Sequence, residues 1–277
     1  MEIFISGCDK IEIDGQTLKA YLNDEKIKEF PLMGVTHLRC VEGRLETLPD
    51  LPESLKELDC SYNEIRVLPK LPKGLKRLLC HDNNLSSLPE LPESLKEVTC
   101  SANHLYELPK LPRALRKLRC DGNKLKTLPE IPETLNRLHC SENYLRCLPK
   151  LPKTLEYLNC RNNQLDELPT LPKSLKELNC CDNYLEILAQ LPPSLIILVC
   201  TGNPLIFIAP LPKRPSSYFI PSELDGVHSK LNYPVYRQRY QTYRYLLTSL
   251  VLEHGMSPSI LSDLWWFPGI INESENP

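Results

Sequence analysis

Nine cysteines recur along this chain at an unbroken spacing of twenty residues, and this regularity limits the possible folds more than any other feature. The nine are Cys40, Cys60, Cys80, Cys100, Cys120, Cys140, Cys160, Cys180 and Cys200. Each lies in the same segment of sequence, approximately LPxLPxxLxxLxCxxNxLxx. Self-similarity at one short period is the signature of a solenoid, in which each repeat packs only against its neighbours. We therefore expect a one-dimensional stack of units, a kind of fold that usually binds partners and seldom catalyses reactions.

The repeat follows the leucine-rich-repeat pattern LxxLxLxxNxL. In one turn its positions are filled by Leu55, Leu58, Cys60, Asn63 and Ile65. A short strand is predicted at residues 57–59, and its copies should stack in parallel at about 4.8 Å to line a concave face. The pattern thus predicts a leucine-rich-repeat solenoid of about nine twenty-residue repeats over residues 35–214.

The return path of each repeat carries paired prolines, for example Pro109 with Pro112 and Pro149 with Pro152. Proline fixes φ and lacks a backbone donor, so it does not suit the interior of an α-helix. The convex side is therefore predicted to be extended or polyproline-like, with almost no helix inside the repeats.

One asparagine recurs in each turn. The column consists of Asn63, Asn83, Asn103, Asn123, Asn143, Asn163, Asn183 and Asn203. A buried carboxamide needs hydrogen-bond partners, and stacked amides can serve the loop backbones of their own and the next turn. We interpret the column as a structural ladder and not as a ligand site.

The cysteine spacing argues against disulfides, although the chain holds twelve cysteines. The nine periodic thiols occupy an apolar core position, and a straight column offers neither a unique pairing nor a tetrahedral metal site. Free buried thiols are expected, with a metal or disulfide arrangement as the alternative. An intracellular reducing compartment follows: the cytoplasm, the host cytoplasm for a secreted effector, or the nucleus. Cys181 is the best candidate for a reactive thiol, while Cys8 and Cys147 are not assigned.

The LPxLPxxLxxL…NxL unit resembles the bacterial class of leucine-rich repeats found in secreted effectors of the YopM and IpaH kind, with cysteine where those more often have valine. The resemblance covers residues 35–214, about two thirds of the chain. It implies an interaction protein that holds a host protein inside a host cell. Similar repeats occur in large viruses, so the source stays open.

Some members of that family continue into a helical ubiquitin-ligase domain with a catalytic cysteine. Residues 215–277 contain no cysteine and are too few for such a domain. The resemblance therefore implies no ligase activity, although an adaptor that recruits a ligase stays open.

The ends of a solenoid need caps. Residues 1–34 alternate in the manner of strands and are expected to form a small β-containing N-terminal cap. Residues 215–277 are expected to form a helical C-terminal cap, because aromatic and leucine residues from Tyr236 to Leu250 recur at helical spacing. Gly255 should end that helix, and Ser257 should open a second one. The aromatic cluster Trp265–Phe267 either locks these helices onto the last repeat or anchors a second partner.

Composition gives no global attraction to polyanions. The formal charge is −2 with 25% charged residues, so any electrostatic targeting must be local. No apolar run approaches the roughly 18 residues of a membrane span, and the first residues lack a secretory signal pattern. Membrane insertion is not expected.

The candidate binding surface is the centre of the predicted concave face, where basic residues cluster with a tyrosine. Its members are Arg77, Arg116, Lys117, Arg119, Arg137, His139, Tyr157 and Arg161. Arginine and tyrosine are the residue types that anchor protein interfaces. We predict a protein partner with an acidic segment; the alternative is a solvated strand face whose charge Asp121 and Glu142 partly offset.

Other functions are less favoured. A single nucleic-acid strand could follow the basic centre, but acidic residues on flanking turns would repel a long polyanion. A structural or scaffold component of a viral or cellular assembly is a further alternative. Ser101 lies between His81 and Asp121 in one row, whereas a catalytic triad needs the base in the middle. No catalytic residue, metal ligand or cofactor site is predicted, and the chain is not expected to be an enzyme.

Overall fold

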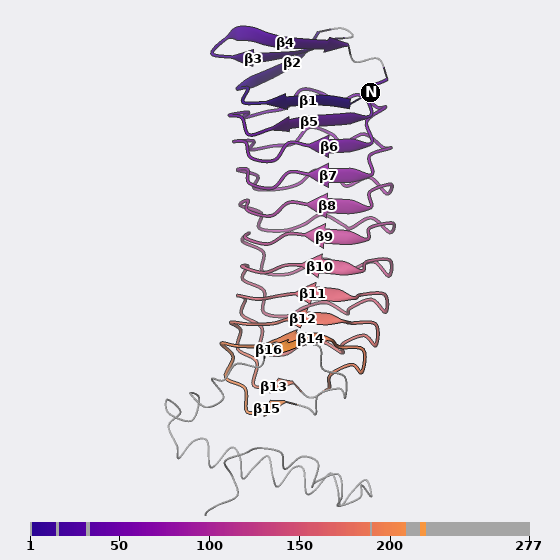
Figure 1. Cartoon of the computed structure of the whole chain (residues 1–277), viewed down its shortest axis with the longest axis vertical. Coiled ribbons are helices and arrows are strands. Elements are labelled where there is room, and N and C mark those ends of the chain that lie inside the picture. The colour runs from indigo at the N-terminus through magenta and orange to yellow at the C-terminus, as the bar shows by residue number, and fades with distance from the viewer. Residues whose placement is uncertain (1, 15–16, 32–33, 189, 209–216, 220–277) are drawn as a thin grey trace, which may run out of the picture.

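The structure is a computed structural model, which describes residues 2–14, 17–31, 34–188, 190–208 and 217–219. Its described residues form a parallel-strand solenoid of about eight turns of about twenty residues (Figure 1). The repeat strands are β5 (His37–Val41), β6 (Glu57–Asp59), β7 (Arg77–Leu79), β8 (Glu97–Thr99), β9 (Lys117–Arg119), β10 (Arg137–His139), β11 (Tyr157–Asn159), β12 (Glu177–Asn179) and β14 (Ile197–Val199). The strand predicted at residues 57–59 is confirmed.

The strands pair at a constant register of twenty residues. Leu58 lies opposite Leu78, and Leu138 lies opposite Leu158. One sheet joins β1 (Glu2–Ser6), the nine repeat strands and β16 (Ser217–Phe219), which pairs with β14. The return path of the described repeats contains no helix, as the prolines predicted.

The first residues form strands. β1 pairs in parallel with β5, so the sheet begins before the first repeat. β2 (Lys10–Asp14), β3 (Thr17–Leu22) and β4 (Glu25–Pro31) form a separate antiparallel sheet at the end of the stack (Figure 1). Alternation explains β1, because Ile3 and Ile5 are buried while their neighbours Glu2 and Phe4 are exposed. The predicted C-terminal helices and the cluster Trp265–Phe267 lie outside the described residues.

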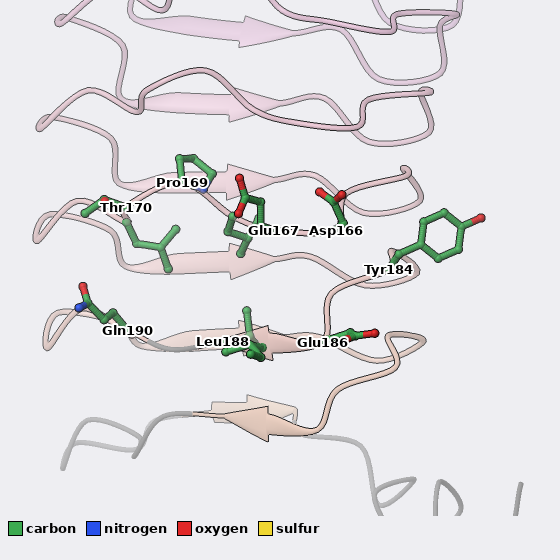
Figure 2. A pocket seen from close by; sticks show the side chains of 11 residues that line it. Asp166, Glu167, Pro169, Thr170, Tyr184, Glu186, Leu188 and Gln190 are labelled. Atoms are coloured by element: carbon green, nitrogen blue, oxygen red, sulfur yellow. The ribbon is translucent and has the colours of Figure 1, made fainter. Parts of the chain in front are cut away.

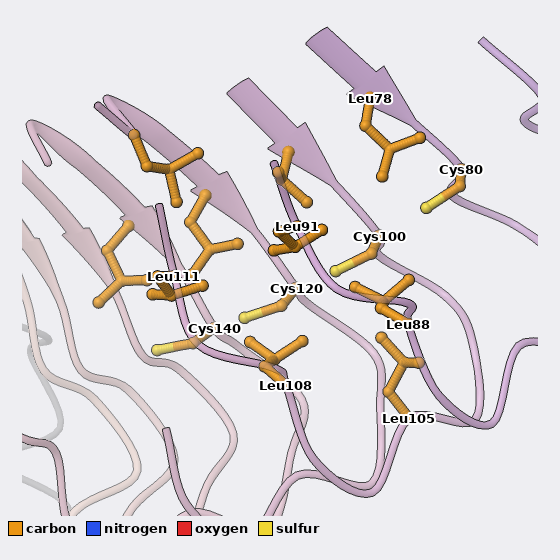
Figure 3. Packing of buried hydrophobic residues seen from close by; sticks show 14 of the residues in the cluster. Leu78, Cys80, Leu88, Leu91, Cys100, Leu105, Leu108, Leu111, Cys120 and Cys140 are labelled. Atoms are coloured by element: carbon orange, nitrogen blue, oxygen red, sulfur yellow. The ribbon is translucent and has the colours of Figure 1, made fainter. Parts of the chain in front are cut away.

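The core is a column of leucines and thiols that runs along the stack. Figure 3 shows the part of it around Cys80, Cys100, Cys120 and Cys140. One turn contributes Leu95, Val98, Cys100, Leu105, Leu108 and Leu111. The predicted burial of the nine periodic cysteines is confirmed. A thiol fits this position because it is small and also acts as a weak donor: Cys120 Sγ lies 3.3 Å from the carbonyl oxygen of His139 in the next turn.

The asparagine amides bind turn to turn, as predicted, but toward the preceding turn and not the next one. Asn83 Nδ2 donates to the carbonyl of Cys60 at 2.9 Å, and Asn83 Oδ1 accepts from the amide of Ile65 at 3.0 Å. The same amide group lies 3.3 Å from the carbonyl of Cys80 in its own turn. The column is a ladder that fixes the register.

Every turn also carries one residue in the left-handed region, two positions after the cysteine. These residues are Glu42, Tyr62, Asp82, Ala102, Gly122, Glu142, Asn162, Asp182 and Gly202. Only glycine takes this conformation without steric cost, while an ordinary residue is disfavoured by about 1–2 kcal/mol. Most turns therefore hold local strain that the stacking on either side overcomes.

This strain can be removed at one exposed position. Ala102 has φ of 50°, so Ala102→Gly is expected to raise the free energy of unfolding by about 1 kcal/mol, measured by urea denaturation. The matched control is Ala114→Gly, at a turn residue that is not among the left-handed ones. Ala114→Gly should lower the free energy of unfolding by about 0.5–1 kcal/mol, because it increases the conformational entropy of the unfolded chain and relieves no strain in the folded one. Equal effects of the two changes would contradict the argument.

Two turns near the end of the repeats depart from this return path. β13 (Ile187–Leu188) and β15 (Phe207–Ile208) form a second parallel sheet there. Earlier turns have proline at the position that follows, as in Pro149 and Pro169, whereas residues 189 and 209 are alanines. Alanine keeps the backbone donor that proline lacks, which permits strand pairing on this side.

Burial makes the core thiols weak acids. Loss of hydration raises the pKa of Cys100 and of Cys160 from 9.0 to about 12, and that of Cys200 to about 11. The pKa values of Cys120 and Cys140 shift in the same direction for the same reason. The column therefore stays protonated at neutral pH.

Stability should fall steeply at alkaline pH. The unfolded chain loses thiol protons near pH 9, while the folded chain keeps them until about pH 12, so unfolding releases protons in this window. Each such thiol steepens the loss by about 1.4 kcal/mol per pH unit. Urea denaturation between pH 8 and about 10.5 should show this slope. Cys160→Val should reduce this slope by about 1.4 kcal/mol per pH unit, which corresponds to one proton. An unchanged slope would contradict the raised pKa of Cys160.

Candidate functional site

The strand face presents columns of outward side chains, and the register decides which of them meet. Arg77 illustrates the geometry. Its guanidinium lies 3.2 Å from Glu57 and 3.3 Å from Glu97, one turn to either side. Lys117 extends this row with a longer contact of 4.0 Å to Glu97. Alternating charges thus neutralise one another over β6–β9.

The centre of the face differs. Arg119 of β9 and Arg137 of β10 are exposed, and neither forms an ion pair with any described residue. Arg116 is also exposed and without an ion pair in the described part of the chain. By contrast, Arg161 lies 3.2 Å from Asp182. The predicted residues therefore divide into free cations at the centre and paired cations on both flanks.

An aromatic pair lies beside these cations. The rings of His139 and Tyr157, on adjacent strands, stack at 4.4 Å between centroids with an interplanar angle of 24°. Burial lowers the pKa of His139; Asp121 opposes this shift, while Arg119 and Arg137 add to it. Burial also raises the pKa of Tyr157. At neutral pH the pair is an uncharged, flat surface next to two guanidinium groups.

Asp121 is held by serines of the neighbouring turns. Its carboxylate accepts from Ser141 Oγ at 2.7 Å and from Ser101 Oγ at 3.2 Å. His81 Nδ1 instead lies 2.8 Å from Asp82. Ser101 is therefore bonded to the acid and not to the base, so this row lacks the order that nucleophilic catalysis needs.

The reactive-thiol prediction for Cys181 is wrong. Its side chain is 4% exposed, and Thr201 Oγ1 donates to its sulfur at 3.0 Å. The neighbouring turn covers it because position 201 carries a branched side chain. Cys147, which the sequence left unassigned, is exposed on the return side.

A shallow hollow of about 800 Å³ lies on the return path of two turns near β13 (Figure 2). Its wall carries the carboxylates of Asp166, Glu167 and Glu186 with the apolar side chain of Leu188. None of the predicted site residues lines it. The hollow was not predicted from the sequence. It lies where alanine replaces the proline of earlier repeats, as at position 189, and this replacement is visible in the sequence.

Other kinds of site find no support in the described ranges. Within them, no group of three or more histidine, cysteine, aspartate or glutamate side chains could hold a metal ion. No helix in the same ranges is long and apolar enough to cross a membrane.

The parallel ladder, the buried thiol column and the asparagine amides define a leucine-rich-repeat solenoid, and comparison with solved structures agrees. The chain superposes on YopM from Yersinia enterocolitica with a TM-score of 0.57 and 36% identity, over 66% of this chain and 45% of that one. It matches YopM from Yersinia pestis, described as a leucine-rich effector protein, with a TM-score of 0.57 and 31% identity, over 66% of this chain and 60% of that one. The fold is thus a leucine-rich-repeat solenoid similar to those of these YopM structures.

A third solved structure shows the fold alone. The leucine-rich repeat domain of APL1B matches with a TM-score of 0.53 and 21% identity, over 63% of this chain and 56% of that one. This chain therefore spans about half of the chains named here. The sequence matches no protein-family model, and the comparison with curated protein sequences found no match.

The environment of His139 can be tested by titration. Its pKa should lie below 6.5, mainly because of burial, so its stabilising contribution is lost as pH falls from 6.5 through the lowered value. Asp121→Asn should lower this pKa further, because the change removes the carboxylate that favours the charged ring. NMR of the ring protons would measure both. Asp166→Asn, on the return path and away from the strand face, should leave the titration unchanged, and a rise of the His139 pKa in Asp121→Asn would contradict the assignment.

Proposed function

We propose that this chain is a protein-binding effector or adaptor that holds an acidic segment of a host or cellular protein on its strand face. The observation that carries the proposal is the unpaired state of Arg119 and Arg137 at the centre of the face, between flanks whose cations are paired. A free guanidinium can bind a partner carboxylate without first breaking an internal ion pair. The centre is therefore where binding costs least.

The aromatic pair supports the same location. The stacked rings of His139 and Tyr157 form a preordered surface beside the two arginines, and arginine with tyrosine is the combination common at interface hot spots. Rigid strands hold these groups in place, so binding orders few side chains. Arg77, Lys117 and Arg161 then belong to the rim, where their existing ion pairs lower their value to a partner.

The effector role is supported by the similarity to YopM and by the LPxLP repeats. Such a role would place the protein in the host cytoplasm, and a long column of free thiols suits a reducing compartment. Catalysis has no part in the proposal. Long nucleic acids are disfavoured, because Glu57, Glu97 and Glu177 lie on the same face and would repel phosphates.

The proposal is tested by charge reversal at the centre. Arg119→Glu/Arg137→Glu should abolish capture of the main protein partner from host-cell lysate, identified by mass spectrometry, and should leave the melting temperature nearly unchanged. Lys110→Glu/Lys150→Glu changes the net charge equally on the exposed return path and should keep the partner. If both variants capture the same proteins, the strand face is not the binding site. In that case the return path or the ends of the stack carry the function, as for a scaffold.

A further inference from the structure

One column of side chains keeps a single sign of charge over four consecutive turns. It lies one residue before each strand and consists of Lys56, Lys76, Lys96 and Arg116, which we call the cationic column. Its backbones are stacked directly: the amide of Lys76 donates to Lys56 at 2.7 Å, and that of Lys96 donates to Lys76 at 2.8 Å. Lys76, Lys96 and Arg116 are exposed, while the ammonium group of Lys56 lies beside Gly74.

Three other charged columns alternate in sign over these four turns, whereas the column that holds Lys126 and Arg146 does not alternate. The strand column reads Glu57, Arg77, Glu97 and Lys117 before Arg137 breaks the alternation, and two return-path columns alternate over the same turns, as in Glu90, Lys110 and Glu130. Like charges on adjacent rungs destabilise a sheet, whereas opposite charges stabilise it. The cationic column therefore departs from the arrangement that stability favours on the same repeats.

The geometry of this column would permit internal pairing. Farther along the same column, Lys176 lies 3.0 Å from Glu156. A carboxylate at one rung thus reaches an ammonium at the next. The four cations lack such a partner because the sequence supplies none in the column, and no ion pair to another described residue replaces it.

We infer that the cationic column is the docking edge for an acidic α-helix of the protein partner, lying parallel to the axis of the stack; this inference rests on the proposed function. Four rungs at about 4.8 Å span about 14 Å. A helix with one carboxylate per turn repeats at about 5.4 Å, so four carboxylates drift from the rungs by only about 2 Å. An extended strand repeats same-face side chains at about 6.7 Å and drifts by about 6 Å. Flexible lysine stems absorb the first mismatch far better than the second.

The helix also reaches the site already described. A helix with its side chains is about 10 Å wide, so one seated on the cationic column extends over the strands toward Arg119 and Arg137. The partner would then set one acidic face on the column while another face meets the arginine centre. This explains why free cations occur both on the cationic column and at Arg119 and Arg137, although ion pairs occupy the strand column over β6–β9.

The test uses two peptides and the substitution Lys76→Glu, which is expected to weaken peptide binding and to raise the melting temperature. The probe is a stapled helix of about fifteen residues with one glutamate per turn on one face; its isomer has the same composition with glutamates distributed around the helix. Lys76→Glu should weaken binding of the one-face helix about tenfold at low salt, by fluorescence anisotropy. The same variant should melt about 1–3 °C higher, because the introduced carboxylate would lie between Lys56 and Lys96.

The matched control is Lys110→Glu, which makes the same change of charge in an alternating column. It should melt lower and bind the one-face helix as the unchanged chain does. A merely structural role of Lys76 would move the melting temperature and leave peptide binding alone, which would overturn the inference. Equal affinity for the two peptides, or tighter binding of a single-stranded oligonucleotide, would also overturn it.

Failure here is distinguishable from failure of the proposed function. If Lys76→Glu leaves partner capture intact while Arg119→Glu/Arg137→Glu abolishes it, the strand face binds the partner but the helix on the column is wrong. If capture survives Arg119→Glu/Arg137→Glu, the proposed function itself fails, and helix binding to Lys76 would then be unrelated to the partner.

Discussion

The structure depends on the hydrogen bonds that each asparagine amide makes to the turn before it. Asn103 shows the pattern: its Nδ2 donates to the carbonyl of Cys80 at 3.0 Å, and its Oδ1 accepts from the amide of Leu85 at 2.9 Å. A buried polar group that loses its partner costs about 1–3 kcal/mol, so a slip of one residue would be penalised at every turn. Register is therefore fixed over the whole stack. The left-handed residue beside each asparagine is tolerated because these bonds over-determine the loop.

A fixed register turns sequence positions into columns, and columns are the level at which the surface acts. Residues twenty apart, such as Glu57 and Arg77, lie in contact although they are distant in the chain. Charge along a column is then either neutralised by the neighbouring turns or left for a partner. Charges neutralised by neighbouring turns stabilise the stack, whereas charges left unpaired attract a partner of opposite charge. A site on this fold is thus recognised by departure from alternation rather than by a pocket, and the hollow near β13 contains none of the free cations.

Much of the fold could be predicted from the sequence, because the period reports directly on packing. The strand at residues 57–59 and the buried thiols follow from apolar spacing. Spacing says nothing of backbone handedness, so left-handed residues such as Tyr62 were not anticipated. Nor does it show how far side chains reach, and Arg77 and Arg161 were grouped with free arginines although both are paired. Cys181 was misjudged for the same reason, since only the structure shows Thr201 beside it.

Of the cationic column only Arg116 was predicted as a binding residue, because the repeat pattern favours the residues within the strands. Its four members stand just outside, where the backbone still stacks but the side chains leave the sheet. Three of the four cations are exposed to solvent at this position. Hydrogen bonds between their backbones nevertheless hold successive members of the column at a fixed spacing. Lys176 and Glu156 show that the column can satisfy itself when the sequence supplies a carboxylate. Where it supplies none, a row of carboxylates at nearly the same spacing is the complement, and one face of a helix has that spacing. The regularity that stabilises the alternating columns thus becomes, on this one, a means of recognition.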